Sequence, residues 1–307
     1  MIEETIPKKP APAAEMSLRH EWRRFLQMLV VLFKLRVVSL LLLAAVGGAF
    51  LGAAGWPGFG TLLLVLCAGG LAASGAAAWN QYLERNSDHL MGRTNKRPLV
   101  NGDIPNPRWI PWIASAMILL PVLLMLPSNP ALSFFLMLGA IIYVGVYTIW
   151  LKPRTLLNIV IGGAAGSAAV LTGGAAAGAW QDPGVIVLAL LVFAWTPTHF
   201  WSLAILYRDD YQRADVPMLP ARTSLRAAAW WVMVHTLLTG FAAMLLGLAP
   251  ALGWLYLAPV TLLTVDMVRR NVRLIREPNP KHALALFIAS NTYLMIILLA
   301  ASIDAVI

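Results

Sequence analysis

GTLLLVLCAGGLAASGAAAWNQYLERNSDHLMGRTNKRPL, residues 60–99, is the stretch that decides the fold, because an apolar run passes directly into a charged loop. Residues 60–83 carry no charged side chain and exceed the roughly 18 residues needed to cross a bilayer. The run is continuously apolar rather than alternating, which predicts a membrane-spanning α-helix and not a barrel strand. Its small residues, Gly69–Ala78, predict close packing against neighbouring helices.

The rest of the chain extends this pattern. Of its 307 residues, 59% are hydrophobic and 12% are charged, whereas a soluble domain carries about 25% charged residues. The sequence therefore predicts an all-α integral membrane protein, a bundle of nine transmembrane helices. Their expected positions are roughly 26–53, 60–83, 108–127, 131–150, 156–178, 185–206, 226–248, 251–270 and 282–304. Residues 1–18 are expected to form a disordered cytoplasmic tail, and residues 19–307 a single polytopic domain.

The net charge of +9 is arranged on one side of the membrane. All 23 Lys and Arg residues fall in five clusters: 8–36, 85–108, 152–154, 208–226 and 269–281. The connections between them, near 55–57, 127–130, 180–183 and 249–253, contain no Lys or Arg. This positive-inside pattern predicts a cytoplasmic N-terminus and a C-terminus outside, in the cell inner membrane. The basic charge thus indicates the lipid bilayer, and no nucleic acid, as a partner.

The first polar motif is Asn80-x3-Glu84-x3-Asp88. The spacing of four places the three side chains on one helical face. Oxygen ligands in such a stripe suit Mg²⁺, which commonly binds through one or two carboxylates and phosphate oxygens. Mn²⁺ accepts the same ligands. The alternative is a polar stripe at a helix end that faces water.

Basic residues follow this motif at once. Arg93, Lys96 and Arg97 supply donors for diphosphate oxygens, so carboxylates and cations together predict a metal-diphosphate site. The alternative is a loop that anchors to anionic lipid headgroups.

A second acidic cluster lies at the same predicted membrane face. It comprises Tyr207, Arg208, Asp209, Asp210 and Tyr211, with Asp215 close behind. Two facing acidic clusters could hold two metal ions with a diphosphate between them. The alternative is an Asp-containing turn with Arg208 and Arg213 as ion-pair partners.

Four segments carry a resemblance to a known family: NQYLERNSDHLMGRTNKRPL (80–99), YTIWLKPRTLLNIVIGGAAG (147–166), WTPTHFWSLA (195–204) and YRDDYQRADVPMLP (207–220). Together they resemble the haem O synthases, a group of UbiA-type intramembrane prenyltransferases. By this resemblance the catalytic, metal-binding residues are Asn80, Glu84, Asp88, Asp209 and Asp210. The basic positions expected to face the diphosphate are Arg93, Lys96, Arg97, Lys152 and Arg208. Tyr211 and His199 complete the expected substrate-binding set.

The resemblance implies transfer of the farnesyl group of farnesyl diphosphate to a vinyl group of haem b (protohaem IX). Water addition then gives haem O and diphosphate. Haem b is thus a substrate, and a downstream haem-modifying enzyme or terminal oxidase is an expected partner. His199 lies inside an apolar run, where it would contact the haem iron or form a hydrogen bond to a neighbouring helix.

The sequence departs from the family pattern at several points. Leu35, Thr198, Ala169 and Val170 stand where prolines are usual, and Asp215 replaces a glycine. Because prolines kink helices, these changes concern the shape of the acceptor cavity. A UbiA-type enzyme for another acceptor, such as an aromatic acid, stays an alternative. So does a transporter, although a transporter would place its charges nearer the membrane midplane.

Overall fold

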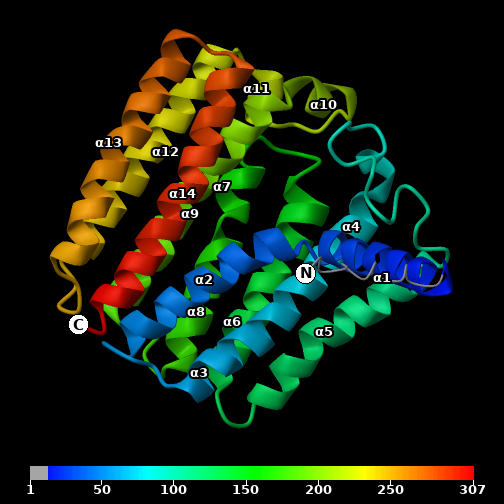
Figure 1. Ribbon diagram of the computed structural model, residues 1–307. Coiled ribbons are helices and arrows are strands. Elements are labelled where there is room, and N and C mark those ends of the chain that lie inside the picture. The colour runs from blue at the N-terminus through cyan, green and yellow to red at the C-terminus, as the bar shows by residue number, and fades with distance from the viewer. Residues whose placement is uncertain (1–12) are drawn as a thin grey trace, which may run out of the picture.

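The computed structural model describes residues 13–307, which fold into a bundle of helices with no strand in that range (Figure 1). The N-terminal half consists of α1 (Ala13–Leu32), α2 (Leu35–Gly52), α3 (Phe59–Leu64), η1 (Val65–Gly69), α4 (Gly70–Asp88), η2 (Pro107–Trp109), α5 (Ile110–Met125), α6 (Pro130–Ala140) and η3 (Ile141–Leu151). The C-terminal half consists of α7 (Asn158–Gly162), α8 (Ala164–Ala176), α9 (Pro183–Leu206), α10 (Arg208–Arg213), α11 (Leu219–Arg222), α12 (Leu225–Leu246), α13 (Trp254–Arg276) and α14 (Pro280–Asp304).

Eight helical stretches in the described residues are long and apolar enough to cross a membrane, and they coincide with eight of the nine expected spans. The exception is 251–270. It forms α13, beside α12 and α14 (Figure 1), but Asp266, Arg269 and Arg270 lie in its second half. With these three charged residues, α13 is less apolar than the eight helices that could cross a membrane.

The first expected helix, 26–53, is wrong as a single element. α1 ends at Leu32 and α2 begins at Leu35, and between them Lys34 adopts a left-handed backbone with φ of 50°. An apolar run carries no signal for such a break, since Lys has no preference for this conformation. Of the predicted tail, residues 1–12 lie outside the described residues, and from Ala13 the chain is helical.

Close approach of α2 and α8 depends on glycine. A Cβ atom on Gly173 would lie 1.7 Å from the Ala45 carbonyl oxygen, and one on Gly48 would lie 2.2 Å from the Val170 carbonyl oxygen. The two backbones therefore touch with no side chain between them, as the small residues predicted. α9 packs against α8, α12 and α14 and buries Leu188, Leu191 and Trp201 in the main core.

Two of the spans contain wide π-helical turns. η1 interrupts the predicted helix 60–83, and η3 forms the second half of the predicted helix 131–150. Such turns are frequent at functional sites. η3 carries Tyr143 and Tyr147, which line the cavity described next.

Candidate functional site

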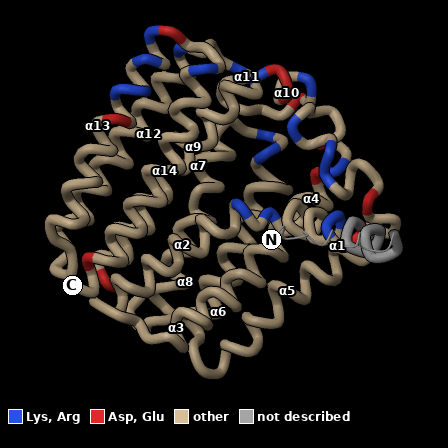
Figure 2. The backbone as a smooth tube through the Cα atoms, in the orientation of Figure 1, with Lys and Arg blue, Asp and Glu red and all other residues tan. Residues whose placement is uncertain are grey.

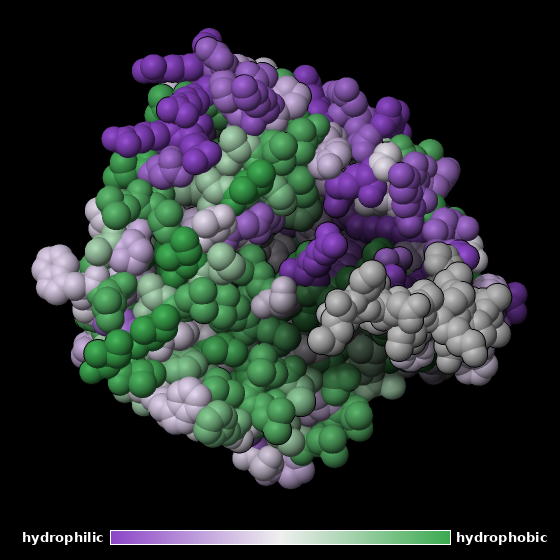
Figure 3. All heavy atoms as spheres, in the orientation of Figure 1, coloured by the Kyte–Doolittle hydropathy of each residue, from purple (hydrophilic) through white to green (hydrophobic). Residues whose placement is uncertain are grey.

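A cavity of about 1210 Å³ opens between α1, α2, α4, η3, α8, α9 and α14. Figure 3 shows the surface hollowed in this region, with hydrophilic residues along one side and hydrophobic residues along the other. The apolar wall contains small residues such as Ala73, Ala76, Gly166 and Ala169, which leave room for a bulky ligand.

The predicted stripe Asn80, Glu84 and Asp88 lines the polar side of this cavity. The three residues project from the last turns of α4 and are only 1%, 8% and 1% exposed. Asn80 Nδ2 donates to Glu84 Oε1 at 2.8 Å and to Thr148 Oγ1 at 2.9 Å. The stripe thus faces a cavity inside the protein and not bulk water, in contrast to the alternative interpretation.

Cations from other elements converge on the stripe. Arg97 forms an ion pair with Asp88 and lies 3.7 Å from Glu84. Lys152, which follows η3, places its Nζ 2.5 Å from Glu84 Oε1. A loop and a helix end that are far apart in sequence therefore supply the positive charge that a diphosphate needs.

Lys34 belongs to the same group, although it was not among the predicted site residues. Its Nζ donates to Asn80 Oδ1 at 2.5 Å and to Tyr143 Oη at 3.1 Å. Burial, and next the charge of Arg97, lower the pKa of the Lys34 ammonium to about 7. The only sequence signal was its position in the Lys34-Leu35-Arg36 segment.

The second acidic cluster joins the first through Arg93. The Arg93 backbone N–H donates to Asp210 Oδ2 at 3.3 Å, and its guanidinium lies 3.5 Å from Tyr211 Oη and over the Tyr207 ring. Asp210 is buried and also pairs with Arg213, so the ion pair expected in the alternative interpretation is present.

Other predicted residues of the two clusters lie apart from this junction. Asp209 and Lys96 are exposed and do not line the cavity. Arg208 donates to the Thr223 carbonyl oxygen at 3.4 Å, and its Nε is buried without a partner among the described residues. Asp215, at φ of 52°, pairs with Arg222 at 2.5 Å.

His199 lines the opposite, aromatic side of the cavity. Its ring stacks between Trp195, at 4.5 Å between centroids, and Phe287, at 4.6 Å. Its Nδ1 lies 3.1 Å from Ser290 Oγ on α14. The expected hydrogen bond to a neighbouring helix is therefore present, and it fixes the ring at the cavity wall.

The side-chain oxygens of the stripe are suitable ligands for a hard cation such as Mg²⁺. Asp88 Oδ1 is buried and has no hydrogen-bond partner among the described residues. Among the described residues, no group of three or more His, Cys, Asp or Glu side chains forms a complete metal site. A cation held here would thus need further ligands from its substrate, as Mg²⁺ has in phosphate sites.

The fold and the site define a polytopic membrane protein with one large cavity, whose polar side combines buried carboxylates with cations. Residues 40–297 match the UbiA prenyltransferase family. The chain belongs to this family and is a prenyltransferase.

Curated relatives agree with this assignment, and solved structures share the fold. The chain is 40% identical over 269 residues to the protoheme IX farnesyltransferase of Metallosphaera sedula, covering 87% of this chain and 92% of the relative. A digeranylgeranylglyceryl phosphate synthase structure shares the fold, with a TM-score of 0.73 at 18% identity over 92% of this chain and 98% of that one. A UbiA homologue from Archaeoglobus fulgidus bound to DMAPP and Mg²⁺ gives 0.63 at 15% identity, over 90% and 99%.

Proposed function

We propose that this prenyltransferase transfers a farnesyl group from farnesyl diphosphate to a vinyl group of haem b, with addition of water, to give haem O and diphosphate. The observation that carries the proposal is that one cavity joins the buried Asn80-Glu84-Asp88 stripe to an aromatic and small-residue chamber. Its volume of about 1210 Å³ exceeds the roughly 300–1,000 Å³ of a pocket for one small ligand, so it has room for two apolar substrates. The name of the relative from Metallosphaera sedula supports the choice of acceptor.

In this proposal the polar side of the cavity binds the diphosphate. Lys34, Arg93, Arg97 and Lys152 are the cations that would turn from their present partners to its oxygens. Mg²⁺, or Mn²⁺ with the same ligands, would be held by Asn80, Glu84, Asp88 and Asp210, and would neutralise the leaving group. The Archaeoglobus homologue, bound to DMAPP and Mg²⁺, supports this choice of cation. By the family resemblance Asp209, Lys96 and Arg208 also belong to this site.

In the proposed reaction the two substrates meet between the two sides of the cavity. The bond between farnesyl C1 and the diphosphate oxygen breaks, and its electron pair leaves with the diphosphate. The terminal carbon of a haem vinyl group then bonds to the allylic cation. Water adds to the adjacent vinyl carbon and releases a proton. The apolar wall excludes bulk water until the carbon–carbon bond has formed.

The chamber around His199 would hold the haem. Trp195, Phe287 and Phe200 supply flat apolar surfaces for a tetrapyrrole ring. The only His199 ring nitrogen that bonds to described residues is Nδ1, which leaves the other for an iron contact. Haem O would then pass to a haem-modifying enzyme or a terminal oxidase in the inner membrane.

The test is an acceptor comparison with purified protein. Farnesyl diphosphate labelled in the farnesyl group is incubated with Mg²⁺ and either haem b or an aromatic acid, and the label is followed into each acceptor. We expect label in the haem fraction only, and none after chelation of the metal. Label in the aromatic acid, with none in haem, would contradict the proposal and assign another acceptor.

A further inference from the structure

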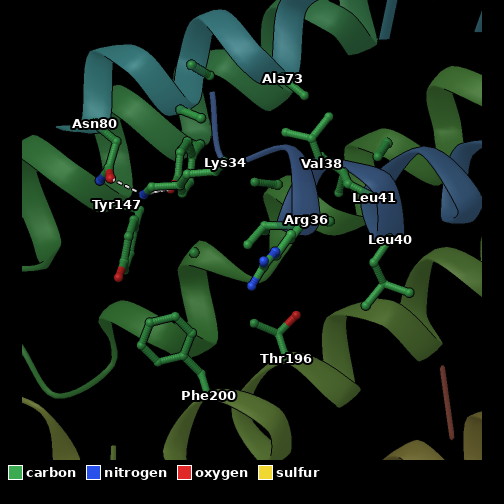
Figure 4. Close-up of a pocket in the computed structure, with 18 of the residues that line it drawn as sticks. Lys34, Arg36, Val38, Leu40, Leu41, Ala73, Asn80, Tyr147, Thr196 and Phe200 are labelled. Atoms are coloured by element: carbon green, nitrogen blue, oxygen red, sulfur yellow. Dashed lines mark hydrogen bonds between the residues drawn. The ribbon is translucent and has the colours of Figure 1, made fainter. Parts of the chain in front are cut away.

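One cation of the cavity has no role in the diphosphate site. Arg36 is the second residue of α2 and lines the cavity. Figure 4 shows its guanidinium extending toward Thr196 and Phe200 of α9, whereas Lys34, two residues earlier, extends toward Asn80 of α4. The left-handed turn at Lys34 separates the directions of the two cations.

The other cations that line the cavity already have partners. Lys34 binds Asn80, Arg97 binds Asp88, Lys152 binds Glu84, and Arg93 contacts the tyrosines of the second cluster. The structure describes side chains from residue 21 onward. Among these, none forms an ion pair or a hydrogen bond with the Arg36 guanidinium, and only the Arg36 backbone carbonyl accepts a hydrogen bond from a side chain, that of Ser39. Arg36 is exposed and lines the cavity, so its guanidinium is open to an anionic group of a ligand.

Among the side chains that the structure describes, from residue 21 onward, none of the cavity carboxylates is available for Arg36. The acidic residues of this range that line the cavity are Glu84 and Asp88, and both are held by Arg97 and Lys152 on the α4 side. The groups toward which Arg36 points, Thr196 and Phe200, are neutral (Figure 4). Arg36 is therefore open to an anionic ligand group on the α9 side of the cavity, away from Asn80.

We infer that Arg36 binds a carboxylate of the prenyl acceptor and thereby fixes its orientation. This inference rests on the proposed function and deepens it. In haem b the carboxylates are the two propionates, which sit on a different edge of the ring from the vinyl groups. A propionate held at Arg36 keeps the ring against the α9 aromatic residues and turns a vinyl edge away from Arg36, toward the stripe on α4. The planar guanidinium suits a carboxylate, because it can donate two parallel hydrogen bonds.

The test compares haem b with its dimethyl ester, which keeps the vinyl groups and loses both carboxylates. Binding of each acceptor is followed by the change in its Soret band. The KM for the acceptor is obtained from turnover at varied acceptor concentration. For the unaltered protein we expect the ester to bind about ten- to a hundredfold more weakly, as for loss of a charged hydrogen-bond partner. Arg36→Gln should bind haem b more weakly by a similar factor, and it should bind the acid and the ester equally well. The KM for farnesyl diphosphate should stay unchanged.

Arg108→Gln is the matched control, because it removes an equivalent charge from an exposed residue that does not line the cavity. It should keep the preference for the acid. Arg36→Lys should restore part of it.

Each outcome decides the inference. Equal binding of the acid and the ester by the unaltered protein overturns the role of Arg36. This result does not depend on the folding of any variant. Equal loss for acid and ester in Arg36→Gln would instead indicate that Arg36 binds a lipid phosphate. Binding that prefers the acid, without prenylated haem, would support the carboxylate site and overturn the proposed function. Formation of prenylated haem with equal binding of acid and ester would support the proposed function and overturn the carboxylate site.

Discussion

At the scale of single residues, the structure separates two neighbours that the sequence treats alike. Asp209 and Asp210 form one motif, but only Asp210 is buried and accepts the Arg93 backbone N–H at 3.3 Å. Asp209 is exposed. The difference arises because the two residues lie about 100° apart on the short helix α10, so only one of them can face the loop of Arg93.

Asp210→Asn should therefore lower kcat more than Asp209→Asn. Asp210 accepts the Arg93 backbone N–H, and losing such a charged hydrogen-bond partner is worth about 1.5–3 kcal/mol, or roughly ten- to a hundredfold, whereas Asp209 is exposed and makes no such contact among the described residues. Steady-state turnover and its Mg²⁺ dependence, measured for both variants, check this. Equal losses, or a larger loss for Asp209→Asn, would place the second metal-binding position at Asp209.

Lys34 shows what single-residue patterns cannot supply. Asn80, Glu84 and Asp88 were predictable because a spacing of four aligns them within one helix. Lys34 reaches Asn80 from the turn between α1 and α2, 46 residues away in the sequence. Local spacing contains no information about such a contact, which depends on how α2 packs beside α4.

At the scale of helices, the sequence predicted where apolar segments lie but not where they bend. The break at Lys34 and the wide turns η1 and η3 all fall inside expected spans, 26–53, 60–83 and 131–150. Hydropathy reports the length of a span and is insensitive to its backbone hydrogen-bond pattern. The glycine-rich segments were more informative, because only small residues permit the contact seen between α2 and α8.

Gly173→Ala should destabilise the protein, since the new methyl group would meet the Ala45 backbone at 1.7 Å. Overpacking of this kind costs about 1–3 kcal/mol. Gly60→Ala is the control, because its Cβ would meet nothing within 4 Å. Thermal unfolding in detergent should show a lower midpoint for Gly173→Ala only. An unchanged midpoint would mean that the two helices are less tightly packed than described.

At the scale of the whole molecule, Lys and Arg gather at the end of the bundle that carries α10 and α11 (Figure 2). The connection between α5 and α6 lies at the opposite end and contains none. Hydropathy and charge thus predicted the bundle and the grouping of its polar residues at one end. They could not predict the cavity of the candidate site, which forms only when α2, α4, η3 and α9 meet.

The positive-inside arrangement predicts that the basic end faces the cytoplasm. In a Cys67→Ala background, Ser128→Cys and Asn101→Cys place one thiol at each end, since both positions are exposed. In sealed right-side-out vesicles a membrane-impermeant maleimide should label position 128 and not 101, and lysis should expose both. Labelling of 101 alone in intact vesicles would invert the orientation.

The most direct measurement is the mass of the haem product. Membranes containing the protein, or its Asp88→Asn variant, are incubated with haem b, farnesyl diphosphate and Mg²⁺, and the extracted haems are separated with mass detection. We expect a more hydrophobic haem, heavier by a farnesyl group plus water, from the unaltered protein and none from Asp88→Asn. Unchanged haem b in both samples, with diphosphate still released, would contradict the assignment of haem as the acceptor. Full activity of Asp88→Asn would contradict the role of the buried stripe.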